Sequence, residues 1–367
     1  MLPFLTMPMR FEDAVEKYAA IAQKMVNGIE NLSHLREDDI KIGVTTKESV
    51  YREDKIVLYR FQPLVEQPLN TPVLIVYALI NRPFMVDLQA GRSLVANLLK
   101  LGLDVYLIDW GYPTRADRWT SLDDYINGYI NNCVDFISTK HSLAKINLLG
   151  ICQGGTFSLC YSAIYPEKVK NLITMVTPVD FQRNHALLNM QGGCTLGAEA
   201  IDIDLMVDAS GNIPGDYLNI EFLMLKPWQL GVLKYLDFPE IMDNEDKLLN
   251  FLRMEKWIFD SPDQTGEAYR QFLKDFYQGN KLIKGEVMIG DRQVDLRNIC
   301  APVLNLYAEK DHLVTPASSL ALEQYIGTTD YTVRSFPVGH VGMYVSSKVQ
   351  KDLPTAIAEW LQERTEI

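Results

Sequence analysis

One cysteine lies in a turn that could make it a nucleophile. The segment Gly150-Ile151-Cys152-Gln153-Gly154 follows a short apolar run and precedes a helical pattern. The spacing Gly-x-Cys-x-Gly has the form of a nucleophile elbow, a sharp strand-to-helix turn in which flanking glycines relieve crowding around a strained backbone. Because a thiol occupies the nucleophile position, this turn predicts covalent catalysis by Cys152.

Two later residues could complete a catalytic triad with this thiol. Asp311 comes just after a predicted strand that ends at Tyr307, and His340 follows another that ends near Phe336. An imidazole is needed to take the thiol proton, and a carboxylate is needed to hold the imidazole in the right tautomer. Nucleophile, acid and base also occur in this chain order in α/β-hydrolases. We therefore predict Cys152 as nucleophile, Asp311 as acid and His340 as base.

Each predicted member has a simpler structural alternative. Cys152 could be an inert core thiol, Asp311 a loop-capping carboxylate and His340 a surface or capping histidine. His312 could compete as the base, although side chains adjacent in sequence normally diverge. The remaining cysteines are predicted to be core residues; they are Cys133, Cys160, Cys194 and Cys300.

A predicted oxyanion hole would stabilise the charge that develops on the attacked carbonyl. In an elbow of this type, one donor is the backbone N–H of the residue after the nucleophile, here Gln153. The second donor comes from the loop after an early buried strand, and we place it at Ile80. The neighbouring Asn81 and Arg82 either contact substrate or only cap this loop.

The thiol also carries information about the substrate. When a thiolate attacks a thioester, the acyl-enzyme is again a thioester, so the exchange is close to balanced and the acyl group stays activated. A serine ester would be a poorer donor for a second transfer. Cys152 therefore favours an acyltransferase that uses an acyl-thioester donor over a simple hydrolase.

Composition narrows the class of protein. The 367 residues carry a net charge of −12 and a sequence pI near 5.0, which argues against a nucleic-acid-binding surface. Five cysteines without a CxxC pair argue against a disulfide framework and a zinc site, and we predict no bound metal. The apolar start from Met1 to Met9 is short, lacks a basic leader and is followed by the charged segment Arg10 to Asp13, so we do not expect a signal peptide. No apolar run approaches the roughly 20 residues that span a bilayer, so we expect a cytoplasmic protein without a transmembrane segment.

The elements that must position these residues alternate between strand and helix. Strand patterns cover 55–61, 71–77, 104–109, 145–149, 171–176, 301–307 and 331–336, and helical patterns cover 93–101, 121–136, 156–165, 318–325 and 349–364. Such a βαβ series predicts a mainly parallel, doubly wound sheet. Together with the elbow and the chain order of Cys152, Asp311 and His340, it favours the α/β-hydrolase fold.

The alternation breaks after Asp180, where the chain becomes rich in Met, Trp, Tyr and Phe and shows helical stretches at 246–259 and 266–277. We interpret this region as a largely helical insertion. The predicted parts are an N-terminal helical segment at 1–45, a first core part at 46–180, the insertion at 181–295, and a second core part at 296–367.

The N-terminal segment has an amphipathic pattern. Apolar residues recur at helical spacing at Val15, Tyr18, Ala22, Met25, Ile29 and Leu32. This pattern predicts a helix whose apolar stripe either packs on the body of the fold or docks a partner.

Several longer stretches resemble one enzyme family. They are Leu74 to Pro83, Asp104 to Gly111, Leu122 to Ile126, Leu149 to Gly155, Thr177 to Phe181, Gly211 to Gly215 and Gly339-His340. Over nearly its whole length the chain resembles the catalytic subunit of a class III, two-subunit-type polyhydroxyalkanoate synthase. The stretches together are far more specific than the elbow alone.

The resemblance implies an α/β-hydrolase core with a cap inserted after the Asp180 region. It also implies polymerisation of (R)-3-hydroxyacyl-CoA, chiefly 3-hydroxybutyryl-CoA, with release of CoA. On this basis Cys152 carries the growing chain and His340 is its base, while Asp311 activates the hydroxyl of the incoming unit, directly or through the histidine. No cofactor is implied, because coenzyme A belongs to the substrate and the product.

The resemblance further implies partners: a second, non-catalytic synthase subunit, a homodimer formed through the cap, a hetero-oligomer, and the surface of cytoplasmic polyester granules. Two rival functions stay open. One is a cysteine α/β-hydrolase such as a thioesterase or a dienelactone-hydrolase-like enzyme. The other is a non-catalytic granule-associated scaffold, against which the intact set of Cys152, Asp311 and His340 argues.

Overall fold

An eight-stranded sheet forms the centre of the fold. The computed structural model describes residues 11–183, 201–224 and 238–364. Across the sheet the strands lie in the order β1 (Lys47–Glu53), β2 (Ile56–Phe61), β6 (Val105–Asp109), β3 (Val73–Val76), β7 (Ile146–Ile151), β8 (Val169–Met175), β11 (Val303–Ala308) and β12 (Tyr331–Phe336). Neighbours from β6 to β12 are parallel, whereas β1 and β2 are antiparallel additions at one edge. The predicted α/β-hydrolase fold with a mainly parallel sheet is confirmed.

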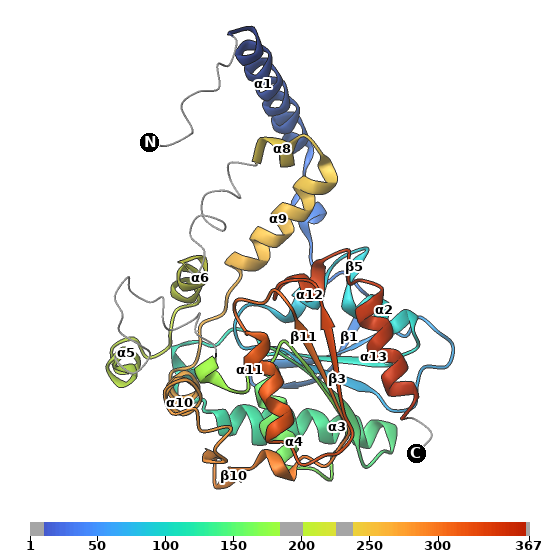
Figure 1. The fold of residues 1–367 in the computed structure, drawn as a ribbon, viewed down its shortest axis with the longest axis vertical. Helices are drawn as coiled ribbons and strands as arrows, with labels where there is room; N and C mark the ends of the chain where they lie inside the picture. Colours follow the sequence, from blue (N-terminus) through green and yellow to red (C-terminus); the bar gives the residue numbers. More distant parts are fainter. Residues whose placement is uncertain (1–10, 184–200, 225–237, 365–367) are drawn as a thin grey trace. The chain divides into compact units, whose positions relative to one another are not determined.

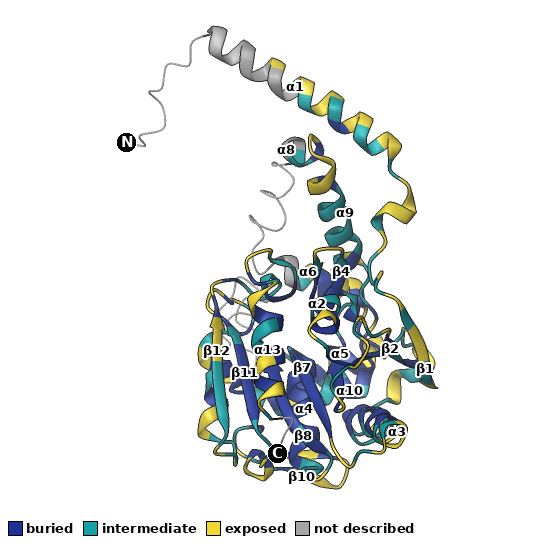
Figure 2. Ribbon diagram, turned by 90° about the vertical axis from the view of Figure 1, so that its right-hand side faces the viewer, coloured by how far each residue is buried: buried dark blue, intermediate teal, exposed yellow. Residues whose placement is uncertain are grey.

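Both faces of the sheet are covered by helices. Helices α3 (Asn131–His141) and α4 (Gln153–Ile164) lie on one face, and α2 (Leu94–Lys100) and α13 (Asp352–Gln362) lie on the other (Figure 1). Every residue of β3, β6 and β7 is buried, as expected for central strands of a covered parallel sheet (Figure 2). The parallel arrangement brings the carboxyl ends of these strands, and the loops that follow them, to one edge of the sheet.

The described part of the insertion is built mainly from helices. These are α5 (Ile203–Ser210), α6 (Gly215–Met224), α8 (Phe238–Met242), α9 (Glu245–Phe259), α10 (Gly266–Gln271) and the π-helix η8 (Phe272–Gln278), followed by the hairpin β9 (Val287–Ile289) and β10 (Arg292–Val294). The hairpin was not predicted, although its two-residue Gly290-Asp291 connection is typical of one.

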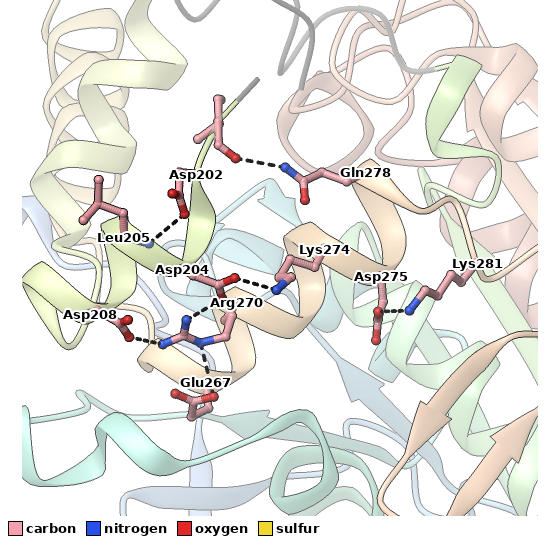
Figure 3. Close-up of polar contacts among 11 residues, drawn as sticks. Asp202, Asp204, Leu205, Asp208, Glu267, Arg270, Lys274, Asp275, Gln278 and Lys281 are labelled. Atoms are coloured by element: carbon pink, nitrogen blue, oxygen red, sulfur yellow. Dashed lines mark hydrogen bonds and ion pairs between the residues drawn. The ribbon is translucent and has the colours of Figure 1, made fainter. Parts of the chain in front are cut away.

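A charged cluster joins α5 to α10 and η8. The Arg270 guanidinium lies 2.6 Å from both Asp204 Oδ1 and Asp208 Oδ1, and 3.4 Å from Glu267 Oε2 (Figure 3). Lys274 Nζ adds a 2.7 Å contact to Asp204 Oδ2. Because one guanidinium binds three carboxylates, the cluster fixes its side chains more strongly than separate exposed pairs would.

Shorter elements complete the fold. They are η1 (Glu37–Ile40), η2 (Pro83–Val86), β4 (Asp87–Gln89), β5 (Arg92–Ser93), η3 (Arg115–Trp119), the π-helix η4 (Asp124–Ile130), η5 (Phe181–Arg183), η9 (Leu296–Asn298), α11 (Pro316–Leu320), η10 (Ala321–Gln324) and α12 (Gly342–Val345).

Two compact units divide the chain: residues 1–41 with 226–258, and residues 42–225 with 259–367. The sheet and all the predicted site residues belong to the second unit. These cuts differ from the predicted part boundaries at 45, 180 and 295, which stay predictions.

In the first unit, helix α1 (Phe11–His34) packs on α8. Asn31 Nδ2 donates to the Met242 carbonyl at 2.8 Å, and Gly28 lies tightly against the Met242 side chain. The predicted helix is confirmed, but Met25 and Ile29 of its apolar stripe are exposed. The stripe is therefore not buried at these two positions, and its two predicted roles, packing on the fold or docking a partner, stay predictions.

The cysteines other than Cys152 only partly follow the prediction. Cys133 and Cys160 are buried, and burial raises the pKa of both thiols. Cys300 is exposed, so its assignment to the core is wrong; it lies in the surface loop between η9 and β11. Cys194 lies outside the described residues. Over the described ranges, no helix is both long and apolar enough to cross a membrane.

The contact between α4 and β3 gives a first prediction. A methyl group added to Gly154 would overlap the carbonyl oxygens of Val76 and Tyr77, which are backbone atoms and cannot rotate away. We expect Gly154→Ala to destabilise the protein by about 1–3 kcal/mol or more, measured by denaturant unfolding. Gly128→Ala is the control, because an added Cβ there meets nothing within 4 Å. Equal denaturation midpoints for the two variants would contradict the close contact between Gly154 and the carbonyl groups of Val76 and Tyr77.

Candidate active site

Cys152 stands on a strained turn between β7 and α4. Its backbone has φ 54° and ψ −125°, a conformation that non-glycine residues rarely adopt and that costs about 1–3 kcal/mol. The turn is held by the Cys152 N–H, which donates to the Met175 carbonyl at 2.9 Å, and by the Gly155 N–H, which donates to the Cys152 carbonyl at 2.9 Å. The predicted elbow geometry is therefore present, and its thiol is half-buried.

Two of the other predicted residues lie in direct contact. His340 Nδ1 is 2.8 Å from Asp311 Oδ2, and the Asp311 side chain is fully buried. The other carboxylate oxygen accepts the N–H groups of Leu313 at 2.8 Å and Val314 at 2.9 Å. These bonds fix the position of the carboxylate, which accepts a hydrogen bond from Nδ1 of His340 and leaves Nε2 for a second partner.

That second partner is the thiol of Cys152. Burial disfavours the charged imidazole, but the negative charges of Asp311 and Cys152 and their hydrogen bonds outweigh it and raise the pKa of His340 to about 10. The ring is thus poised to hold a proton between a carboxylate and a sulfur. His312, the competing candidate, is exposed, and the carboxylate of Asp311 binds His340 instead.

Three tyrosines interact electrostatically with Cys152, and none of them was predicted from the sequence. Burial raises the pKa of Tyr77, Tyr277 and Tyr344, and the charge of Cys152 adds to the rise in each case. The Tyr344 ring meets the His340 ring edge-on, with centroids 6.1 Å apart. The available signal was weak: Tyr277 belongs to the aromatic-rich insertion, and Tyr344 lies four residues after His340.

The loop that follows β3 carries the second predicted oxyanion donor, Ile80. The Leu79 N–H donates to the Gln153 side-chain oxygen at 3.0 Å, and the indole N–H of Trp110 donates to the Tyr77 carbonyl at 3.0 Å. Gln153 is the first residue of α4, where backbone N–H groups have no partner within the helix. Both predicted donors therefore belong to segments that are tied to each other.

Arg82 ends the same loop in a buried ion pair. Its Nη2 lies 2.5 Å from Asp109 Oδ2, and its guanidinium stacks 4.2 Å from the centroid of the Tyr112 ring. Burial raises the pKa of Asp109, an effect that the charge of Arg82 opposes. Of the two predicted roles for Arg82, these contacts favour anchoring the loop over touching substrate.

Among the described residues, no group of three or more His, Cys, Asp or Glu side chains could hold a metal ion. The expectation of a site without metal or cofactor stays a prediction.

Comparison with known proteins gives two family matches. Residues 71–346 match the alpha/beta hydrolase fold family, and residues 13–98 match the N-terminal region of poly-beta-hydroxybutyrate polymerase. Among solved structures, Est1E from Butyrivibrio proteoclasticus covers 88% of this chain and 99% of its own, with a TM-score of 0.52 and 13% identity. At that identity the likeness concerns the fold alone.

Full-length relatives are much closer in sequence. A poly(3-hydroxyalkanoate) polymerase subunit from Synechocystis sp. is 70% identical over 365 residues, which is 99% of this chain and 96% of the relative. A subunit of the same name from Allochromatium vinosum is 54% identical over 345 residues, with 94% and 95% covered.

The contact between Asp311 and His340 predicts a specific pH response. Asp311→Asn removes the carboxylate charge, so the pKa of His340 should fall from about 10 toward or below its ordinary value of 6.5. NMR titration of labelled histidines measures this, and His141, which contacts Asp104, is the internal control. Because the folded pKa of His340 is raised, its contribution to stability is present below pH 6.5 and is lost as the pH rises toward 10. A variant with an unchanged His340 titration would contradict the assignment.

Proposed function

The chain belongs to the poly(3-hydroxyalkanoate) polymerase family, and we propose that it polymerises (R)-3-hydroxyacyl-CoA, chiefly 3-hydroxybutyryl-CoA, with release of CoA. One observation carries the proposal: in a chain 70% identical to a named polymerase subunit, a thiol on a strained elbow faces a histidine that a buried aspartate holds. We assign Cys152 as nucleophile, His340 as base and Asp311 as acid.

In the first step the thiol takes the acyl group from CoA. His340 holds the proton of Cys152 while the sulfur attacks the thioester carbonyl, and a tetrahedral oxyanion forms. The backbone N–H groups of Gln153 and Ile80 are proposed to stabilise this oxyanion, supported by the N-terminal end of α4, which favours negative charge. As the carbonyl re-forms, the C–S bond to CoA breaks, and the CoA sulfur receives the proton from His340.

In the second step the 3-hydroxyl of another unit attacks the acyl group on Cys152. The hydroxyl proton passes to His340, a C–O ester bond forms, and the C–S bond to Cys152 breaks. Both oxygens of Asp311 already accept hydrogen bonds, from His340, Leu313 and Val314, which supports activation of the hydroxyl through the histidine. Because the product of each acyl transfer is an ester or another thioester, no cofactor is required.

The same proposal includes the partners of the chain. The relatives are named subunits, which supports a second, non-catalytic synthase subunit in a hetero-oligomer. A homodimer formed through the cap and attachment to cytoplasmic polyester granules are further parts of the proposal.

The product distinguishes the proposed polymerase from a thioesterase. With (R)-3-hydroxybutyryl-CoA and the purified chain together with its second subunit, we expect CoA release to accompany insoluble polyester. Cys152→Ala should abolish both, whereas Cys300→Ala, at an exposed cysteine, should retain both. Release of free 3-hydroxybutyrate alone would indicate the cysteine hydrolase. A wild-type chain that neither releases CoA nor forms polymer would point to the non-catalytic scaffold, whereas unchanged polymer formation by Cys152→Ala would contradict Cys152 as the nucleophile.

The two steps should depend differently on Asp311. A hydroxyl is a much weaker acid than a thiol, so proton removal by His340 matters more in elongation than in acylation. We expect Asp311→Asn to slow elongation by about 10²–10³-fold and acylation of Cys152 by about tenfold or less, from single-turnover CoA release and polymer growth. Equal loss in both steps would mean that Asp311 serves mainly to orient the ring.

A further inference from the structure

A glutamine from the insertion reaches the loop that carries Ile80. Gln264 lies between α9 and α10, and only 4% of its surface is exposed. Its backbone is fixed by two hydrogen bonds with Ile213, each 2.9 Å long, one in each direction. From this bridge its side-chain Nε2 donates to the Leu79 carbonyl at 2.8 Å.

Leu79 is thereby held from both sides. Its N–H donates to Oε1 of Gln153, from the elbow, and its carbonyl accepts from Gln264, from the insertion. Both glutamine side chains are buried, so water does not compete for these bonds. The two partners also fix the orientation of each glutamine amide, since a backbone N–H requires an oxygen and a carbonyl requires a nitrogen.

The bond to the Leu79 carbonyl has a consequence at the next residue. The carbonyl of Leu79 and the N–H of Ile80 belong to the same planar trans peptide group, in which the two bonds point in opposite directions. A donor that fixes the carbonyl therefore fixes the direction of the Ile80 N–H. It also polarises the peptide, which makes that N–H a stronger donor.

We propose that Gln264 is a positioning residue for the oxyanion hole: it aims the Ile80 N–H at the carbonyl oxygen of the acyl thioester while the elbow supplies the Gln153 N–H. This inference rests on the proposed function, because it takes Ile80 as a donor to the oxyanion. It makes the insertion part of the catalytic apparatus, since the bridge between Ile213 and Gln264 sets where the side-chain amide lies.

A purely structural role for Gln264 would have a different signature from a positioning role. Loss of packing would disturb the whole site, including the reactivity of the Cys152 thiol. Loss of positioning would harm only steps that form an oxyanion. Alkylation by iodoacetamide needs the thiol and His340 but forms no oxyanion, whereas acylation by a thioester needs all of these features.

The test compares these two reactions in Gln264→Met and Gln264→Glu, which keep the side-chain length but cannot donate as the amide does. With the chain and its second subunit, we expect acylation by (R)-3-hydroxybutyryl-CoA, followed as single-turnover CoA release, to fall about 10- to 100-fold. The KM should stay within about twofold, and so should the rate of Cys152 alkylation.

Gln278→Met is the matched control, because Gln278 Nε2 donates to a backbone carbonyl of the insertion, that of Ile201, at 3.1 Å. It should leave both reactions within about twofold of the wild type. Unchanged acylation in both Gln264 variants, or an equal fall of acylation and alkylation, would overturn the positioning role. Failure of the proposed function itself looks different, because the wild type would then form no polyester from this thioester, whether or not Cys152 is acylated.

Discussion

The close packing of α4 against the central strands is the constraint on which the site depends. Cys152 can hold its unfavourable backbone conformation only because β7, β8 and α4 fix the chain on both sides of it. That packing leaves no room for a Cβ at Gly150, Gly154 or Gly155. The strained turn places the sulfur at the carboxyl edge of the sheet, next to the first-turn amides of α4, where a developing negative charge is favoured.

The loops after β11 and β12 depend on the same edge. Their strands are parallel neighbours, so Asp311 and His340 leave the sheet side by side and meet at 2.8 Å. Burial alone would keep the imidazole neutral, yet the two negative groups on either side of it reverse that tendency. In these buried surroundings of low polarity, the interactions of His340 with Asp311 and Cys152 are stronger than they would be in water.

How much the sequence predicts follows from how local each signal is. Short spacings predict the elbow and the order of Asp311 and His340 along the chain. Continuous apolar runs predict the buried strands. The fold confirms the strands and helices that carry these residues. The polar edge strand β1 was missed because Lys47–Glu53 is mostly polar or charged and lacks a buried face. Cys300 was wrongly predicted to be a core residue, because its burial was inferred from the residue type alone.

The role of Gln264 could not be read from the sequence. Its partners Ile213 and Leu79 are 51 and 185 positions away in the chain, and nothing in its own neighbourhood marks it. For Tyr77, Tyr277 and Tyr344 the sequence offers at most a weak signal, because they come from separate elements that approach Cys152 only in the folded protein.

The bridge between Ile213 and Gln264 also bears on how such an enzyme could be redesigned for other monomers. The insertion is the natural place to vary, because its sequence is less constrained by the sheet than the core is. Exchanging it as a block, however, would also replace Gln264, the residue that holds Leu79. Substrate specificity and turnover would then change together. A graft that keeps residues 211–215 and 261–266 native would allow specificity to be altered while turnover is preserved.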